Sequence, residues 1–437
     1  MDYIVVTSSC PFSHEKISSR EVNSISVGGV ATALNSMITK YGGTWICWGK
    51  GGYDEKYTSE ELGKYKIKRI ILDKHEKLGY YDYFSNGVMW PLFHYFRQNI
   101  KIFNDSYKTY YNVNKKFAYK IMEDITDNTI IWIHDYQLTM VPEILRENGI
   151  NNKIIFTWHI PWVSPEFFSI IPQAKDIMKS LSKSDIITFH TKIYEKNFIS
   201  TYKYMFRDKL KSKVYALPLG IDNKYFSSFN NKMINLYNIK NRKIIFSIDR
   251  LDYTKGLINR ILAIEGLLRR HPEYINKFVY IMNVTPSRST VADYISMKRE
   301  LEMTIGRVNG EFSTINWSPI KYMYRKIKTS TLISYYKTAD IALITPLIDG
   351  LNLVSKEFIS VTEKGILILS KFAGSAYTMK DALIVNPYDI NEMANAIIKA
   401  IKMPENEIKE RLTNLKEDVE TKNSEWWYKK IISIAEK

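Results

Sequence analysis

Two cations stand in a loop that follows an apolar run near the middle of the chain. The run KIIFSI (243–248) leads into DRLDYTKG (249–256), and a helical pattern follows. Fixed cations beside a helix N-terminus can hold a diphosphate, because both donate to its oxygens. Arg250 and Lys255 are therefore candidates for diphosphate binding. The structural alternative is that Arg250 forms an ion pair with Asp249 or Asp252.

A second loop with similar potential follows the apolar run 341–347 and reads DGLNLVSKE (349–357). The N–H groups of Leu353 and Val354, at the start of the predicted helix, can donate to phosphate oxygens. Glu357, one turn further on, can accept hydrogen bonds from the vicinal diol of a ribose. A lone glutamate more commonly caps or pairs on a helix surface, so that alternative stays open.

The first half of the chain has weaker signals. Gly28 and Gly29 precede a helical pattern, and a glycine pair lets backbone approach a phosphate. Asp135 follows an apolar run and can bind sugar hydroxyls or cap the next helix. His159 can contact a sugar hydroxyl or be purely structural. The pattern has no His/Cys spacing typical of zinc, no nucleophile elbow and no P-loop, so no metal is expected.

Positioning these residues requires strands that end where the polar residues begin. Near-continuous apolar runs separated by helical patterns, such as 256–272, predict an α/β fold with parallel sheet covered on both faces. In such sheets ligands bind at the carboxyl ends of the strands. The predicted strands lie within 2–9, 129–135, 153–160, 185–191, 243–252, 277–284, 341–347 and 366–372.

The chain divides into two halves of βα repeats. A polar, Asn- and Lys-rich stretch predicts a linker at 223–242, between domains at 1–222 and 243–420. The remaining 421–437 predicts a C-terminal helix. The length of 437 residues is compatible with two or three domains at about 150 residues each. With two such domains, the cleft between them is the expected site.

The charge balance favours anionic partners. The chain carries 62 Lys+Arg against 46 Asp+Glu, a net charge of +16. We find no RNP motif, zinc finger or basic zipper, so we expect no nucleic-acid partner. The N-terminus lacks the basic region of a secretory signal, and no uninterrupted apolar run reaches about 18 residues. We therefore expect no membrane partner and a cytoplasmic location.

Cysteine usage points the same way. The only cysteines, Cys10 and Cys47, exclude a disulfide scaffold and any four-cysteine zinc site. They fit a reducing compartment.

Taken in order, the motifs resemble one family across nearly the whole chain. They are YYDYFSNGVMWPLFH (80–94), HDYQL, HIPWVSPE, FHT, PLGID, DRLDYTKG, PSRSTVADY, GRVNG and TPLIDGLNLVSKE. This set resembles glycosyltransferase family 20. The resemblance implies a GT-B architecture: two Rossmann-like domains facing a central cleft, with the C-terminal helix crossing back to the N-terminal domain.

The resemblance also implies an activity. Such an enzyme moves glucose from a nucleotide-glucose, usually UDP-glucose, to glucose 6-phosphate with retention of configuration and gives trehalose 6-phosphate. It implies no cofactor and no metal, and an N-terminal acceptor domain with a C-terminal nucleotide-sugar domain. The matching positions carry over as catalytic residues Arg250, Lys255, Asp349 and His159; donor-binding residues Gly28, Gly29, Leu353, Val354 and Glu357; and acceptor-binding residues Tyr81, Trp90, Asp135 and Arg288.

The chain departs from the family pattern after the first strand. Where the family usually reads Ser-Asn-Arg, this chain has Ser8-Ser9-Cys10, so the arginine that commonly binds the acceptor phosphate is missing. The following loop, 11–27, carries His14, Lys16 and Arg20. We expect this loop to fold over the acceptor, with Lys16 or Arg20 replacing the missing cation. Ile348 also replaces a common arginine, and Trp162-Val163 replaces Phe-Pro.

Three alternatives remain open. The donor can be kept with another phosphorylated acceptor, such as glycerol 3-phosphate, as in a glucosylglycerol-phosphate synthase. The chain can be a non-catalytic homologue, or it can couple cyclitols without a true glycosidic bond. The retained Arg250, Lys255 and Glu357 favour catalysis. The sequence leaves open the choice among UDP, ADP and GDP, a homo-oligomeric state and any allosteric effector.

Overall fold

The computed structural model describes residues 2–17, 20–25, 29–103, 105–229, 233–234, 242–287 and 292–436. The chain forms two compact units. Unit 1 comprises Met1–Leu219 and Ser424–Lys437, and unit 2 comprises Gly220–Asn423. Within the described residues, no helix has the length and apolar character needed to span a membrane.

Unit 1 is built on an eight-stranded sheet with the order β10-β9-β8-β7-β1-β4-β6-β5. All neighbours pair in parallel except the edge strand β5, which pairs antiparallel with β6. The chain order reverses between β1 and β7, so the loops that follow these two strands diverge. The strands are β1 (Asp2–Thr7), β4 (Gly43–Trp48), β5 (Ser59–Leu62), β6 (Tyr65–Ile70), β7 (Thr129–His134), β8 (Ile154–Thr157), β9 (Ile186–Phe189) and β10 (Lys213–Ala216).

The helices of unit 1 include one unusual element. Residues Lys77–Met89 form a 13-residue π-helix, η2, between α2 (Lys74–Glu76) and α3 (Trp90–Phe93). Long π-helical segments are rare, and π-type turns often occur at functional sites. The other helices are α1 (Gly29–Tyr41), η1 (Asp54–Tyr57), η3 (Arg97–Asn99), α4 (Ser106–Met122), η4 (Tyr136–Leu138), α5 (Val141–Glu147), α6 (Pro165–Phe168), α7 (Ala174–Leu181), α8 (Lys192–Met205) and α16 (Ser424–Ala435).

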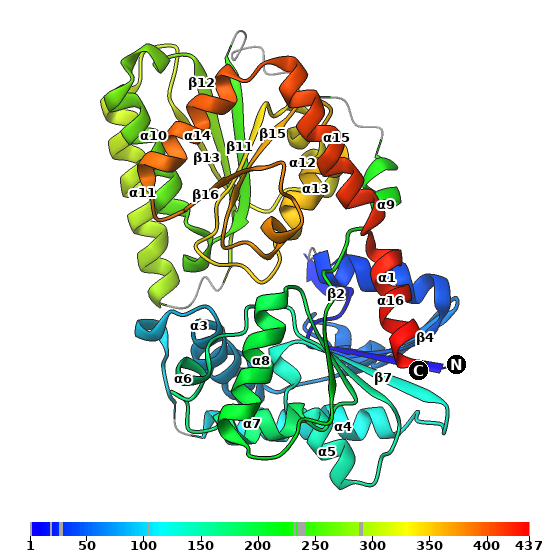
Figure 1. Ribbon diagram of the computed structural model, residues 1–437. Coiled ribbons are helices and arrows are strands. Elements are labelled where there is room, and N and C mark those ends of the chain that lie inside the picture. Colours follow the sequence, from blue (N-terminus) through cyan, green and yellow to red (C-terminus); the bar gives the residue numbers. More distant parts are fainter. Residues whose placement is uncertain are drawn as a thin grey trace. The chain divides into compact units, whose positions relative to one another are not determined.

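The last helix, α16, packs within unit 1 against α1 (Figure 1). Trp427 of α16 lies against Trp132 of β7, with ring centroids 5.1 Å apart. Its indole N–H donates to the backbone oxygen of Leu217 at 3.2 Å. Through this buried aromatic contact, α16 is held on the sheet of unit 1, the sheet that contains β1.

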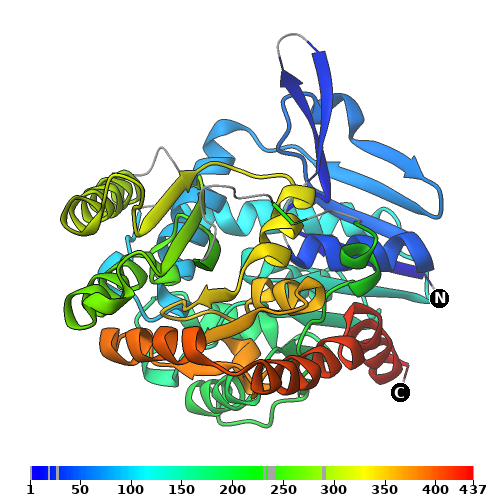
Figure 2. The same cartoon turned by 90° about the horizontal axis from the view of Figure 1, so that it is seen from above.

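The segment expected to be a loop at 11–27 contains a β-hairpin. Strands β2 (Phe12–Ile17) and β3 (Arg20–Ile25) pair antiparallel, and Figure 2 shows the hairpin extending away from the sheet of unit 1. Its base is fixed by hydrogen bonds between His14 and the 51–54 turn. The His14 N–H donates to Asp54 Oδ1 at 2.8 Å, and the Tyr53 N–H donates to the His14 oxygen at 2.9 Å.

The two cysteines are joined to each other. Cys10 and Cys47 form a disulfide with a Cα–Cα distance of 5.1 Å, and both side chains are buried. The interpretation that the two cysteines fit a reducing compartment did not anticipate this bond. Sequence spacing could not reveal this pair, because β1 and β4 become neighbours only in the folded sheet.

Unit 2 has a six-stranded parallel sheet with the order β13-β12-β11-β14-β15-β16. In chain order this is 3-2-1-4-5-6, the order of dinucleotide-binding folds, with its switch point between β11 and β14. The strands are β11 (Lys243–Arg250), β12 (Phe278–Thr285), β13 (Ile320–Tyr324), β14 (Ile341–Ile344), β15 (Ile366–Ser370) and β16 (Leu383–Val385).

Helices cover both faces of this sheet (Figure 1). One layer contains α10, α11 and α14, and the other contains α12, α13 and α15. The helices are α9 (Asn223–Ser227), η6 (Tyr253–Lys255), α10 (Leu257–Arg270), η7 (Pro272–Tyr274), α11 (Ala292–Phe312), α12 (Thr329–Thr338), α13 (Leu353–Val361), η8 (Gly374–Tyr377), α14 (Ile390–Lys402) and α15 (Glu405–Thr421).

The strand predictions hold well. All eight apolar runs contain a strand, and the helical pattern at 256–272 is α10, which buries one apolar face and ends before His271-Pro272. The predicted linker at 223–242 differs from expectation at its start, because Asn223–Ser227 form α9, which packs on α13. The unpredicted strands are β2, β3, β4, β5, β6, β10, β13 and β16. Four of them, β5, β10, β13 and β16, lie at the edges of the two large sheets.

Candidate functional site

In unit 2, two loops meet at the carboxyl ends of β11 and β14. The Leu347 N–H donates to the Thr254 oxygen at 2.8 Å and joins the loops directly. Gly256 makes the approach possible, because its φ is +63° and an added Cβ would lie 2.6 Å from the Thr345 oxygen. Only glycine adopts this conformation without strain. The predicted residues of both loops are thereby brought together at the switch point of the sheet.

Lys255 and Asp349 form the centre of this cluster. The Lys255 Nζ lies 2.5 Å from Asp349 Oδ2, and the side chains are only 13% and 16% exposed. The side-chain N–H of Asn352 donates to the same carboxylate at 3.2 Å, while Asn352 Oδ1 accepts from the Ser355 N–H and caps α13. A cation, a carboxylate and the N-terminus of α13, which begins at Leu353, therefore occupy one place.

Arg250 is more exposed than Lys255. Its guanidinium is 46% exposed and lies 3.8 Å from Asp252 Oδ2, a distance typical of a weak ion pair. Asp249 does not pair with Arg250. Its carboxylate instead contacts the fully buried Arg260 at 2.6 Å, and Arg260 also donates to the Lys255 oxygen at 2.8 Å. The buried Arg260 thus supports the backbone of Lys255, a role that the sequence did not reveal.

Glu357 lies one turn into α13 in a desolvated setting. Burial raises the pKa of this carboxyl to about 7, and the Tyr336 hydroxyl, which donates to Oε2 at 3.2 Å, opposes the shift. A carboxylate of this kind accepts hydrogen bonds from ligand hydroxyls more strongly when it is ionised. Leu353 and Val354 precede it and are half-buried at the start of α13.

In unit 1, Asp135 directly follows β7 in a strained conformation. Its φ of 73° lies in a region that non-glycine residues seldom adopt, and such strain concentrates at functional sites. Its Oδ1 accepts from the backbone N–H of His159 at 3.2 Å. Burial raises the pKa of Asp135 to about 7, opposed by hydrogen bonds from the backbone of Tyr136 and His159.

His159 is the middle member of a chain of three buried histidines. His134 Nδ1 lies 3.0 Å from His159 Nε2, and His159 Nδ1 lies 3.1 Å from His190 Nε2. The Leu219 N–H donates to His190 Nδ1 at 3.3 Å. Burial lowers the pKa of His134 to about 3 and that of His159 well below its ordinary value, so both rings are neutral at neutral pH.

The backbone donor assigns every tautomer in this chain. Because His190 Nδ1 must accept from Leu219, its Nε2 carries the proton and donates to His159. His159 then donates through Nε2 to His134, whose own Nε2–H has no hydrogen-bond partner among the described residues. Both nitrogens of His159 are thus occupied, so contact with a sugar through this ring requires it to break one of these bonds.

Two of the predicted acceptor residues, Tyr81 and Trp90, lie on the π-helix and on the short helix that follows it. Tyr81 of η2 lies against Trp48 at the end of β4, with ring centroids 5.3 Å apart. Trp90 begins α3 and lies 5.9 Å from the ring of Tyr136. Tyr81 also lies beside Lys50, whose Nζ is 4.5 Å from its ring centroid.

The remaining predicted residues differ in how far they can be described. Gly29 is the first residue of α1, and Arg20 is the first residue of β3. The side chain of Arg20, the whole of Gly28 and the whole of Arg288 lie outside the described residues. Within the residues that are described, no group of three or more His, Cys, Asp or Glu side chains is placed to hold a metal ion.

Lys50 is the main residue at these strand ends that sequence reasoning missed. It belongs to a Gly-rich turn, GKGG (49–52), directly after the unpredicted strand β4. Recognising GTWICW (43–48) as a strand would have placed the lysine at the carboxyl edge of the sheet. The histidine chain had no such signal, because its members come from three separate strand ends.

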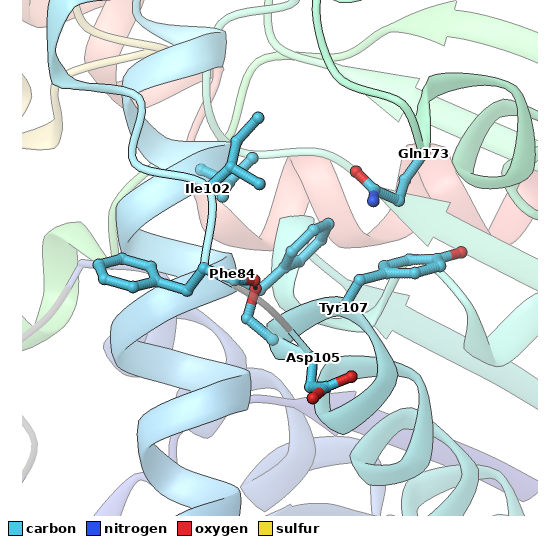
Figure 3. Close-up of a pocket in the computed structure, with 8 residues that line it drawn as sticks. Phe84, Ile102, Asp105, Tyr107 and Gln173 are labelled. Carbon is cyan, nitrogen blue, oxygen red and sulfur yellow. Dashed lines mark hydrogen bonds between the residues drawn. The ribbon is translucent and has the colours of Figure 1, made fainter.

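A separate pocket of about 220 Å³ lies beside α4 (Figure 3). Phe84, Ile102, Tyr107 and Gln173 line it, together with Asp105 at the start of α4. None of the predicted catalytic or ligand-binding residues contributes to this pocket, so it is not part of the candidate site.

Comparison with known proteins agrees with the fold. The bifunctional trehalose-6-phosphate synthase/phosphatase of Thermoproteus tenax is 35% identical over 435 residues, which cover 92% of this chain and 59% of that protein. The chain thus spans less than two thirds of that relative. An E. coli structure bound with UDP-2-fluoro glucose matches with a TM-score of 0.92 and 30% identity, covering 100% of this chain and 99% of the other.

A third match is a UDP-forming alpha,alpha-trehalose-phosphate synthase from Burkholderia xenovorans in complex with glucose-6-phosphate. It has a TM-score of 0.92 and 28% identity and covers 100% of both chains. These likenesses confirm the α/β fold of GT-B type with two Rossmann-like units. The model of glycosyltransferase family 20 matches residues 2–437. With its motifs, its two parallel sheets and this match over the full length, the chain belongs to glycosyltransferase family 20.

Proposed function

We propose that the chain transfers glucose from UDP-glucose to glucose 6-phosphate with retention of configuration and releases trehalose 6-phosphate and UDP. Family membership makes it a glycosyltransferase. The donor is supported by the UDP-2-fluoro glucose of the E. coli relative, and the acceptor by the glucose-6-phosphate of the Burkholderia relative. The observation that carries the proposal is the cluster of Lys255, Asp349 and the α13 N-terminus at the switch point of unit 2.

The donor diphosphate gains negative charge as the bond to the anomeric carbon breaks. Lys255 is already fixed by Asp349, so little reorganisation is needed when that charge develops. Arg250, whose side chain is 46% exposed, is proposed to contact a second phosphate oxygen. The N–H groups of Leu353 and Val354 at the start of α13 add partial positive charge at the same place.

The sugar and ribose contacts follow the same layout. Glu357 accepts from the ribose hydroxyls, and Asp349 contacts the donor glucose while it stays paired with Lys255. Gly28 and Gly29 stay proposed as backbone contacts to the phosphates. These assignments are supported by motif position and, for Glu357 and Asp349, by their setting in unit 2.

On the acceptor side, Asp135 binds the sugar hydroxyls, and Tyr81 and Trp90 contact the phosphate, with Arg288 contributed by motif. The raised pKa of Asp135 is also compatible with proton exchange with a reacting hydroxyl near neutral pH. His159 is proposed to reach the donor sugar by giving up one bond of the histidine chain.

We also propose that the enzyme works in the cytoplasm on small soluble substrates, without nucleic-acid or membrane partners. The disulfide counts against a typical reducing cytosol, because cytosolic disulfides are rare outside hyperthermophiles. If the enzyme acts in the cytoplasm, we therefore expect either a hyperthermophilic host or a disulfide that forms only under oxidising conditions.

An acceptor screen tests the function. The purified chain is given UDP-glucose with glucose 6-phosphate, glycerol 3-phosphate or unphosphorylated glucose, and UDP release is measured while the product is identified by mass. We expect turnover with glucose 6-phosphate and a product of the mass of trehalose 6-phosphate. Faster turnover with glycerol 3-phosphate would favour the alternative acceptor, and no acceptor-dependent release would contradict the proposal. ADP- and GDP-glucose in parallel establish the nucleotide preference.

A further inference from the structure

The structure lacks a cation where the family pattern expects one. The third residue after β1 is Cys10, and its sulfur is bonded to Cys47. A disulfide carries no charge and offers no N–H donor to a phosphate. If the acceptor phosphate binds at the end of β1, its positive partner must therefore come from another element.

Lys50 is close to the end of β1 because of the strand order. It lies two residues after β4, and β4 is the parallel neighbour of β1, with Thr7 opposite Cys47. The Lys50 Nζ donates to the Ser9 hydroxyl at 2.7 Å. The ammonium thus lies beside the residue that precedes the missing arginine.

Two aromatic rings hold this ammonium in place. The Nζ lies 4.5 Å from the ring centroids of both Trp48 and Tyr81, and the two rings are inclined at 64° to each other. Cation–π contacts of this kind attract the charge without neutralising it. Among the described residues, no carboxylate forms an ion pair with Lys50. An ammonium has three donors, and Ser9 occupies only one of them.

The loop that carries Ser9 is itself fixed. The Trp45 indole N–H donates to the Thr7 hydroxyl at 2.8 Å, and the Tyr80 hydroxyl donates to Ser8 Oγ at 3.1 Å. The next residue, Cys10, is tied to β4 by the disulfide. The surroundings of Lys50 are therefore preorganised, and they need little ordering when it binds an anion.

The strand order also places Lys50 at a suitable distance from the sugar-binding carboxylate. β7, which ends at His134 just before Asp135, and β4, which precedes Lys50, flank β1 on opposite sides. Strands β7 and β4 are therefore two strand spacings apart, a distance of about 10 Å. This separation is comparable to the length of a hexose phosphate, so one molecule can reach Asp135 with its hydroxyls and Lys50 with its phosphate.

The electrostatic setting agrees. The side chain of Lys50 keeps exposed surface, yet the protein atoms around its ammonium displace water and lower its pKa; Tyr81 and Asp82 oppose this shift, and Lys77 adds to it. A cation that is partly desolvated and has no carboxylate in ion-pair contact among the described residues gains most from a bound dianion.

We propose that Lys50, held by Trp48, Tyr81 and Ser9, binds the phosphate of the acceptor in place of the missing arginine. This inference rests on the proposed function, because it assumes a phosphorylated acceptor in unit 1. It replaces the expectation from the sequence that Lys16 or Arg20 supplies the charge.

The test compares four proteins: wild type, Lys50→Met, Lys50→Arg and the control Lys56→Met. Methionine keeps the apolar stem between the rings and removes the charge. Lys56 is a matched control, because its Nζ also lies 4.5 Å from one aromatic ring, that of Tyr53, on an exposed turn. Glucose 6-phosphate binding is measured by calorimetry, and KM values are measured for both substrates and for unphosphorylated glucose. Thermal melting checks that each variant is folded.

We expect Lys50→Met to weaken glucose 6-phosphate binding and raise its KM about 10- to 100-fold, as for the loss of one charge-assisted hydrogen bond. The KM for UDP-glucose and the kcat/KM for unphosphorylated glucose should stay at the wild-type value. Lys50→Arg should recover most of the affinity, and Lys56→Met should behave as wild type.

Other outcomes overturn the inference. Unchanged glucose 6-phosphate affinity in folded Lys50→Met does so, as does an equal loss for unphosphorylated glucose, which would mean that Lys50 only supports packing. A loss seen with Arg20→Ala but not with Lys50→Met returns the role to the hairpin. If the wild type binds glucose 6-phosphate but does not turn over, only the proposed function is refuted. The ratio of the glucose 6-phosphate affinities of wild type and Lys50→Met then still tests the role of Lys50. Wild type that does not bind it refutes both.

Discussion

Removal of the Cys10–Cys47 disulfide should destabilise unit 1 by a predictable amount. The bond closes a loop with a sequence separation of 37 residues. In the chain-entropy model, a loop of this length restricts the unfolded chain by about 13 cal/mol/K, which is worth about 4 kcal/mol at 25 °C. For a unit of this size, each kcal/mol shifts the melting temperature by about 2–4 °C, so a decrease of about 8–16 °C is expected.

The assay has two parts. First, thiols are counted in denatured, unreduced protein, where the structure predicts none. Second, melting is followed by calorimetry for wild type before and after reduction in denaturant and refolding, and for the double variant Cys10→Ala/Cys47→Ala. Because both side chains are buried, the double variant also loses packing, and it should melt slightly below reduced wild type.

Two results would refute this reasoning. Two reactive thiols in unreduced, denatured protein would show that the bond does not form. Identical melting of oxidised and reduced protein would show that the bond forms but does not restrict the unfolded chain. Since the bond also fixes the loop that carries Ser9 beside Lys50, reduction should raise the KM for glucose 6-phosphate and leave that for UDP-glucose unchanged.

Three further predictions concern unit 2. Lys255→Ala should lower kcat by a factor of about 10²–10³ with the fold intact, as for one lost transition-state donor. The control Lys243→Ala removes a lysine that is paired to an aspartate at the opposite end of β11, and it should leave kcat unchanged. Equal kinetics in both variants would contradict the assignment of Lys255. Glu357 has a pKa raised from 4.5 to about 7, so the folded protein binds more protons than the unfolded chain between these values, and the free energy of unfolding should fall as pH rises through that window. In Glu357→Gln this part of the slope should vanish in denaturant titrations, and the improvement of the UDP-glucose KM as pH rises through 7 should vanish with it. Gly256→Ala should cost at least about 1–3 kcal/mol in denaturant unfolding, because its φ is +63° and the new Cβ meets the Thr345 oxygen. The helical control Gly306→Ala, where nothing lies within 4 Å, should be neutral or stabilising; a Gly256→Ala protein as stable as this control would show that the loop can relax.

The sequence alone was sufficient for the class of the fold and for half of the sixteen strands found in the described residues. Buried parallel strands must be apolar on both faces, so runs such as 243–248 and 341–347 are recognisable locally, and polar residues directly after them mark the carboxyl edge of a sheet. For that reason Lys255 is recognisable as a candidate from local sequence, whereas the role of Asp349 was implied by the family resemblance. Ordered motifs then identified the family, since each is short but their sequence spans the chain.

The partners of these residues were decided only by the tertiary structure. Neighbouring strands in a parallel sheet come from distant parts of the chain, so strand order determines which side chains meet at the edge. In the folded structure Asp249 pairs with Arg260 and not with Arg250. Cys10 is bonded to Cys47, and Lys50 donates to Ser9. Local sequence carries no record of these pairings, because each depends on segments that become adjacent only when the sheet forms.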